Sequence, residues 1–63
     1  MTQQNVIRKS DKILLRFGYC DFEHDGAFDS DTEEIIELNF VFADFPIVNY
    51  RYNVGTETFE VAE

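Results

Sequence analysis

Residues 21–34, with the sequence DFEHDGAFDSDTEE, contain seven carboxylates and the only histidine of the chain. Side chains of these types could bind a metal ion, carry out acid–base catalysis, or present negative charge to a basic partner. Each of these chemistries requires its own spacing and its own environment. The spacing of the residues therefore decides which of the three the sequence favours.

The nearest metal motif is a calcium loop of the EF-hand type. Asp21, Glu23 and Asp25 fall at loop positions 1, 3 and 5, and Gly26 falls at the turn position 6. The bidentate glutamate that position 12 requires is replaced by Thr32, and the residues before the loop favour a strand over a helix. We therefore expect no metal site and no cofactor, with a weak calcium-binding module as an alternative.

Acid–base catalysis by carboxylates requires two acids in different environments, one of them kept protonated by burial. The acids here crowd around an expected Asp25–Gly26 turn, where we expect water to reach them. Cys20 and His24 would lie about 13 Å apart on a strand that rises about 3.3 Å per residue, which is too far for a thiolate–imidazole pair. No serine or cysteine stands in a nucleophile motif. The sequence predicts a protein that is not an enzyme.

The negative charge is concentrated in one part of the chain, whose formal net charge is −8. Residues 1–16 contain four basic residues and Asp11, a balance of +3, whereas residues 17–63 contain twelve acidic residues and Arg51, a balance of −11. A surface this acidic repels nucleic acid and anionic membranes and attracts basic proteins. We therefore expect a basic protein surface as the partner, with no direct nucleic acid and no membrane.

The cysteine content and the hydropathy pattern bear on location. Cys20 is the only cysteine, which excludes an intramolecular disulfide and favours a reducing compartment. No apolar run is long enough for a signal peptide or a membrane span. We expect a cytoplasmic protein, in the host cytoplasm if a phage encodes it.

The elements that must position the acidic residues are strands. Sixty-three residues form one small domain, 1–63, with residues 1–10 as a flexible or edge segment. Ile36, Leu38, Phe40 and Phe42 alternate as in a strand, although a capping box keeps one short helix near 29–36 as an alternative. The expected fold class is mainly β or α+β. It is a small antiparallel β-meander of about four strands, near residues 12–24, 34–43, 47–53 and 57–61.

The apolar content, at 44 % with seven Phe and three Tyr, is high for so small a core. A single sheet has two faces, and here the second face also carries apolar residues: Leu14, Cys20, Phe22, Ile35 and Val41. Either a helix or a second copy of the chain must cover the first face. We expect a homodimer.

Carboxylates at alternate strand positions recur about every 6.6 Å, so they can occupy a groove built for phosphates. The sequence favours a non-catalytic acidic protein that docks a hairpin, from Asp21 to Glu37, onto a nucleic-acid-binding partner. DNA-mimic inhibitors of the phage counter-defence type, such as anti-CRISPR or anti-restriction proteins, act in this way. The alternative is a small accessory subunit with an apolar interface. The expected partner-binding residues are Asp21, Glu23, Asp25, Phe28, Asp29, Asp31, Glu33, Glu34 and Glu37.

Overall fold

The computed structural model describes residues 2–24, 26 and 28–62, and within them the chain contains five β-strands and no helix. The strands are β1 (Gln4–Arg8), β2 (Leu14–Gly18), β3 (Glu33–Glu37), β4 (Asn49–Asn53) and β5 (Thr58–Ala62). The expectation of a small antiparallel β fold is confirmed. The short helix kept as an alternative near 29–36 does not form, because residues 30–32 make a turn and Glu33 begins a strand.

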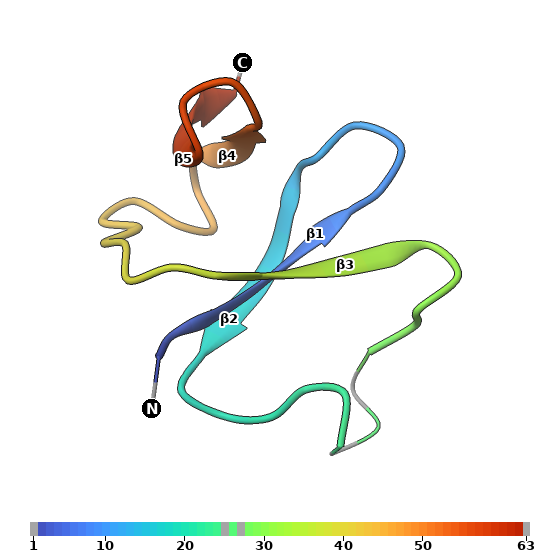
Figure 1. Cartoon of the computed structure of the whole chain (residues 1–63). Coiled ribbons are helices and arrows are strands. Elements are labelled where there is room, and N and C mark those ends of the chain that lie inside the picture. Colours follow the sequence, from blue (N-terminus) through green and yellow to red (C-terminus); the bar gives the residue numbers. More distant parts are fainter. Residues whose placement is uncertain (1, 25, 27, 63) are drawn as a thin grey trace.

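The strands form two antiparallel sheets, of order β2-β1-β3 and β4-β5 (Figure 1). β1 is the central strand of the larger sheet, where Val6 pairs with Arg16 on one side and with Ile35 on the other. We expected residues 1–10 to be flexible or to form an edge. The physical reason for the difference is that Val6 and Ile7 point to opposite faces, both of which are covered, so each side chain is fully buried.

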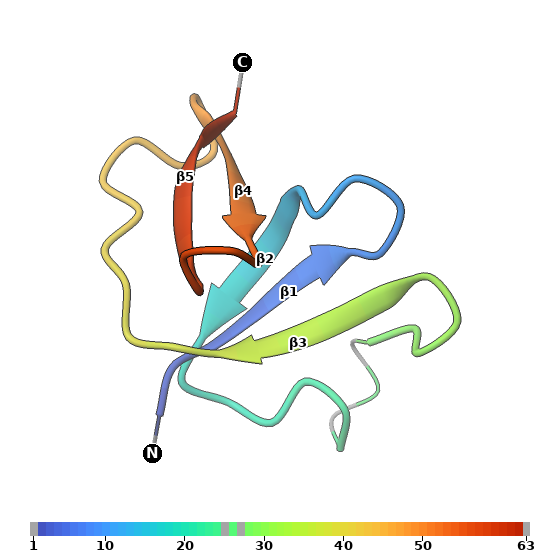
Figure 2. The same ribbon diagram turned by 45° about the horizontal axis from the view of Figure 1, so that its top comes forward.

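The two sheets meet at the residues that precede β2 (Figure 2). Lys12 has a positive φ of 63°, and its carbonyl accepts a hydrogen bond from the Tyr52 backbone N–H at 3.0 Å. Ile13 forms an isolated antiparallel bridge with Arg51. The β4–β5 hairpin is therefore held beside the start of β2.

The main core lies between the β4–β5 hairpin and one face of the larger sheet (Figure 1). Phe42 is at its centre, 6 % exposed, with ring centroids 4.7 Å from Phe17, 5.0 Å from Tyr50 and 4.9 Å from Phe59. The predicted alternation is confirmed for the residues that are buried in this core or packed against it: Ile36, Leu38, Phe40, Phe42, Val48, Tyr50, Tyr52 and Phe59. It is wrong for Val61, which we expected on the same face and which is 52 % exposed.

The strand expected at 34–43 ends at Glu37, although its side chains keep alternating. Beyond Leu38, hydrogen bonds that involve side chains replace the backbone ladder between this segment and the start of the chain. The Gln3 backbone N–H donates to Asn39 Oδ1 at 3.1 Å, and the Phe40 N–H donates to Gln3 Oε1 at 3.2 Å. The chain then runs through the connector of residues 38–48, which contains a cis Phe45–Pro46 bond.

A buried polar residue, Asn5, joins β1 to the end of β3. Its side chain is fully buried; Nδ2 donates to the carbonyls of Ile36 and Leu38, both at 2.9 Å. Its Oδ1 accepts a hydrogen bond from Gln3 Nε2 at 2.6 Å. Because each of these polar atoms is satisfied, the amide can be buried without the penalty of an orphaned donor.

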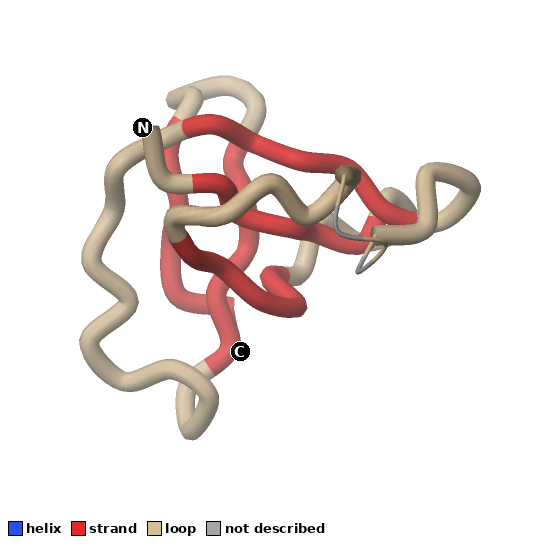
Figure 3. The backbone as a smooth tube through the Cα atoms, turned by 90° about the horizontal axis from the view of Figure 1, so that it is seen from below, coloured by secondary structure: helices blue, strands red, loops and turns tan. Residues whose placement is uncertain are grey.

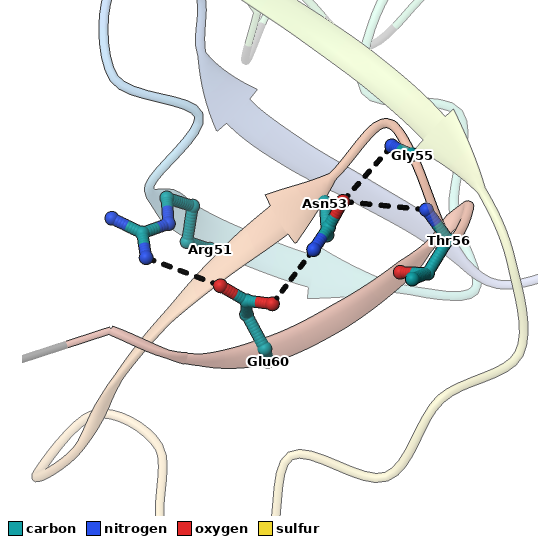
Figure 4. A network of polar contacts seen from close by, with 5 residues as sticks. All are labelled: Arg51, Asn53, Gly55, Thr56 and Glu60. Atoms are coloured by element: carbon teal, nitrogen blue, oxygen red, sulfur yellow. Dashed lines mark hydrogen bonds and ion pairs between the residues drawn. The ribbon is translucent and has the colours of Figure 1, made fainter.

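The β4–β5 hairpin has its own polar network (Figure 4). Asn53 Oδ1 accepts hydrogen bonds from the N–H groups of Gly55 at 2.9 Å and Thr56 at 3.3 Å. Asn53 Nδ2 and the Arg51 guanidinium both donate to the Glu60 carboxylate, at 2.9 and 3.1 Å. These bonds lower the pKa of Glu60, with Asn53 as the larger cause.

The β4–β5 hairpin packs on one face of the larger sheet (Figure 1). On the other face, the buried Phe22 lies against Gly18 of β2. The larger sheet therefore does not need a second copy of the chain to pack on the face that the hairpin covers. Homodimerisation remains a prediction, now based only on exposed apolar side chains such as Val41 and Ile47, which are 82 % and 92 % exposed.

Candidate functional site

The acidic segment, residues 21–34, lies mostly in the connection between β2 and β3, and its last two residues begin β3. The described residues of this connection lie on the side of the sheet away from the hairpin (Figures 1 and 3). Phe22 holds it there and is 8 % exposed. A Cβ built on Gly18 would lie 3.7 Å from Phe22 Cζ, and the Arg16 guanidinium lies 5.9 Å from the centre of the Phe22 ring. Phe22 therefore forms a small second core over this face, to which the central-strand residue Val6 points.

Asp21 and Asp29 of the acidic segment stabilise turns and do not lie in a strand, whereas Glu33 and Glu34 lie in β3. Asp21 Oδ1 accepts a hydrogen bond from the His24 backbone N–H at 3.0 Å, and Asp29 Oδ1 accepts one from the Asp31 N–H at 3.0 Å. The strand expected over 12–24 ends at Gly18, which is a correction to the prediction. Short polar side chains that bond nearby backbone groups favour turns over strands, and this explains the difference.

The regular row of charges expected at Asp21, Glu23 and Asp25 is therefore not formed as a strand ladder. Residues 22–24 lie in a turn, and Asp25 lies outside the described residues. Gly26 has a φ of 76°, in agreement with the turn expected there, and its N–H donates to the Glu23 carbonyl at 3.4 Å. The hairpin expected from Asp21 to Glu37 is also replaced, because β1 lies between β2 and β3.

Two of the expected partner-binding residues, Glu33 and Glu34, are paired within the chain. Glu33 Oε1 lies 2.6 Å from Arg16 Nη2, and Glu34 Oε1 lies 3.3 Å from Lys12 Nζ. A hydrogen bond from the Asp29 backbone N–H, followed by the Arg16 guanidinium, lowers the pKa of Glu33. These two residues connect the elements of the fold, and their charges are partly neutralised by basic residues of the first sixteen positions.

The remaining cations also have acceptors in the same chain. Arg8 pairs with Asp11 at 3.0 Å, which lowers the pKa of Asp11 and raises that of Arg8. Lys9 Nζ donates to the Ser30 carbonyl at 2.7 Å. Arg51 pairs with Glu60 as described above. The cationic groups are thus used internally, and the surplus negative charge is at the surface.

The exposed acids of the expected site are on the acidic segment and at the end of β3: Asp21, Glu23, Asp29, Asp31 and Glu37. Phe28 is only half buried, so part of its ring is accessible beside them. A depression of about 480 Å³ is lined by Asp21, Glu23 and His24. A second one, of about 380 Å³, is lined by Arg8, Lys9, Ser10, Asp31 and Thr32. Both are open, so an acidic surface offers contact to a large partner more readily than it encloses a small ligand.

The acids and His24 form no metal-ligating group in the part of the chain that the structure describes. No group of three or more His, Cys, Asp or Glu side chains among these residues could hold a metal ion. The strands β2 and β3 flank the acidic segment where a calcium loop would have helices. Cys20 is a half-buried free cysteine.

Sequence reasoning missed two features of this site. The anchoring role of Phe22 was hidden because the segment was interpreted as a strand with all its acids on one edge. The free outer edge of β3 was hidden because its pairing with β1 joins residues that lie far apart in the sequence. The only sequence signal for the first feature is the pair of phenylalanines, Phe22 and Phe28, within a run of acids.

Comparison with family models, with curated proteins and with solved structures gave no match to this chain. Within the described residues there is no helix of the length and apolarity needed to cross a membrane.

Proposed function

We propose that this protein is a non-catalytic acidic binding protein that docks its acidic segment onto a basic surface of a partner protein. The favoured partner is a nucleic-acid-binding protein, whose phosphate-binding residues the carboxylates would occupy, as in a DNA-mimic inhibitor. The observation that supports this is the distribution of charge. The five Lys and Arg side chains all bond to acceptors within the chain, whereas a set of acids stays exposed: Asp21, Glu23, Asp29, Asp31 and Glu37.

Internal pairing of the Lys and Arg side chains matters because it leaves a negative electrostatic potential around the molecule. A net charge of −8 on a domain with a radius of gyration of 10.9 Å attracts cationic partners over several ångströms. Surface charges are screened over about 8 Å at physiological ionic strength, so this attraction should weaken as salt rises. The expected binding has a fast, salt-dependent association and gains affinity from several separate charge contacts.

Anchoring of the acidic segment supports binding by lowering its entropic cost. Phe22 is packed under the segment, and the Asp21 and Asp29 carboxylates close local turns. Groups that are already ordered lose less freedom when a partner binds. The acids that present charge are thus fixed to the sheet by other residues of the same segment.

The test is a matched pair of double charge reversals. Glu23→Lys with Asp31→Lys changes the acidic segment, whereas Asp44→Lys with Glu57→Lys changes the net charge equally at exposed sites elsewhere. No hydrogen bond or ion pair is formed by these four carboxylates among the described residues, so both variants should fold.

The partner is captured from cell extract with the wild-type protein and identified, and its affinity for all three proteins is measured at two salt concentrations. We expect the reversal in the acidic segment to weaken binding at least about tenfold, and the control reversal to weaken it much less. Double-stranded DNA should compete for the same partner surface. Equal, salt-independent binding by all three proteins would mean that the acids are only a solvated surface.

A specific observation also supports a second candidate, an accessory subunit with an apolar interface. Val41 and Ile47 are 82 % and 92 % exposed, and both lie in the connector of residues 38–48. In that case Ile47→Ser would weaken binding, and the reversal at Glu23 and Asp31 would leave the affinity unchanged. The same binding assay therefore separates the two candidates.

A further inference from the structure

β3 is an edge strand of the larger sheet. In the order β2-β1-β3 it has a strand neighbour on one side only (Figure 2). Its pairing with β1 is bounded by two backbone hydrogen bonds, from the Leu38 N–H to the Gln3 carbonyl at 3.1 Å and from the Lys9 N–H to the Thr32 carbonyl at 2.9 Å. In an antiparallel ladder, bonded and non-bonded pairs alternate.

The alternation fixes which backbone groups face outward. The register places Ile36 and Glu34 at the positions whose N–H and C=O groups point to β1. The N–H and C=O groups of Ile35 and Glu37 consequently point away from the sheet. Among the residues that the structure describes, none forms a hydrogen bond with these outward groups.

The first outward N–H of β3 has a hydrogen-bond partner, whereas those of Ile35 and Glu37 have none among the described residues. The Glu33 N–H donates to the Asp29 carbonyl at 2.8 Å, so the turn before β3 occupies the first position. Natural edge strands are commonly protected by charged side chains, a proline or a β-bulge. β3 has no proline, and its pairing with β1 has no register shift, so its glutamates are the protection that its sequence provides.

The charge of β3 selects the kind of strand that could pair with this edge. Three of its five residues are glutamates, and Glu37 is exposed. Pairing with a second copy of β3 centred on Ile35 would place Glu33 opposite Glu37 twice, and like charges directly opposite each other are destabilising. A strand that carries lysine or arginine would instead meet the exposed Glu37 carboxylate, while Glu33 and Glu34 keep their partners Arg16 and Lys12.

On the basis of this geometry, we propose that the free edge of β3, at Ile35 and Glu37, accepts an extended lysine- or arginine-bearing segment of the partner protein as an added strand. This inference rests on the proposed function, because it specifies how a basic partner is held. The backbone groups of Ile35 and Glu37 would supply the main-chain hydrogen bonds, and the exposed carboxylate of Glu37 would supply the preference for basic residues.

The first measurement uses wild-type protein and a pair of synthetic peptides in which lysine alternates with threonine. One peptide is unmodified; the other is N-methylated at alternate residues on the edge that would pair, which keeps its charge and removes its ladder donors. We expect the unmodified peptide to bind at least about tenfold more tightly. Amide NMR signals of Ile35 and Glu37 should shift and become protected from exchange, whereas that of Val61 on β5 should not.

The second measurement separates backbone from charge at one exposed position. Glu37→Pro removes both the carboxylate and the outward N–H, and Glu37→Gln removes only the charge. Proline is tolerated at an edge position whose N–H faces solvent, so the variant should fold, and its amide spectrum checks this. We expect Glu37→Pro to bind the unmodified peptide at least about fivefold more weakly than Glu37→Gln does.

The possible results distinguish the two proposals. Equal binding of both peptides, with Glu37→Pro equal to Glu37→Gln, would overturn the added-strand proposal. If that binding were still salt-dependent and sensitive to the Glu23 and Asp31 reversal, the proposed function would stand. Absence of binding by either peptide would overturn the added-strand proposal, and the reversal assay with the captured partner would then decide the function by itself.

Discussion

Replacement of Phe22 by alanine tests whether the acidic segment is packed on the sheet. Phe22 is 8 % exposed and lies against Gly18, with the Arg16 guanidinium over its ring. Phe→Ala substitutions in cores cost about 3–5 kcal/mol, and a surface segment that can collapse into the gap should be at the low end. Loss of the Arg16 contact is worth about 0.5–1 kcal/mol and is part of this cost. We therefore expect a loss of about 3 kcal/mol.

This loss is large relative to the stability of so small a domain. Typical values of about 0.05–0.15 kcal/mol per residue give a total of about 3–9 kcal/mol for a chain of this size. A loss of 1 kcal/mol lowers the melting temperature of such a domain by about 4–8 °C, so Phe22→Ala should lower it by about 12–24 °C. The variant should be marginally folded at room temperature.

The assay is urea unfolding followed by circular dichroism and tyrosine fluorescence, with the midpoint and slope of the transition both fitted. Tyr19→Ala is the matched control, because Tyr19 is a neighbouring aromatic residue that is 65 % exposed, and its loss should cost less than about 0.5 kcal/mol. Phe22→Leu should give an intermediate loss. A loss below about 1 kcal/mol for Phe22→Ala, or equal losses at both aromatic positions, would refute the packing of the segment on the sheet.

Four further outcomes are expected. Asn5→Ala should cost about 2 kcal/mol in urea unfolding, because it removes the donor to two partly buried carbonyls and the acceptor of the buried Gln3 amide; an unchanged midpoint would contradict the role given to Asn5. Asn53→Ala should cost about 1 kcal/mol by the same assay, through the loss of two turn hydrogen bonds, and a cost near zero would mean that water replaces them. Hydrogen bonds lower the pKa of Asp11, Glu33 and Glu60 in the folded chain, so the unfolded chain takes up protons first; stability should be retained at neutral pH and fall once the pH drops below about 4, and an urea midpoint equal at pH 7 and pH 3 would oppose this. Light scattering should give about twice the chain mass of 7.4 kDa if the predicted homodimer forms, and a concentration-independent mass of one chain would exclude it.

The parts of the fold that could be predicted from the sequence are those where side-chain alternation and packing agree. Ile36 to Phe42 and Val48 to Tyr52 alternate in the sequence, and their apolar members face one core in the structure. Local alternation reports which side chains share a face, whether or not the backbone is paired. This is why the alternation of residues 38–42 was right although the strand ends at Glu37.

The position of β1 could not be predicted, because the information lies outside the segment. Its five residues contain two aliphatic side chains and a buried Asn5 whose partners are at the far end of β3. Asparagine is usually a turn or surface residue, so its presence favoured a flexible segment. Burial of Asn5 is favourable only because its Nδ2 donates hydrogen bonds to the carbonyls of Ile36 and Leu38, which are distant in the sequence.

The candidate site was only partly predictable, because its ion pairs also join residues that lie far apart in the sequence. The charge surplus follows from composition alone, and most of the acids named for the site are exposed. Which acids are paired depends on tertiary contacts, such as those of Glu33 with Arg16 and of Glu34 with Lys12. The capping box that suggested a helix near 29–36 corresponds to a different interaction in the structure. The Asp29 N–H donates to the Glu33 carboxylate, as in a capping box, but the chain continues as a turn and then a strand.

The central place of β1 has a consequence for synthesis on the ribosome. β1 and β2 are made first and can pair as a local hairpin, but the second partner of β1 follows only after residues 19–32. The core around Ile7 needs Phe42, Tyr50 and Phe59 as well, and the last of these lies near the end of the chain. A nascent chain therefore leaves the core around Ile7 incomplete until Phe59 has emerged. Folding of this domain should finish as one cooperative event after that point.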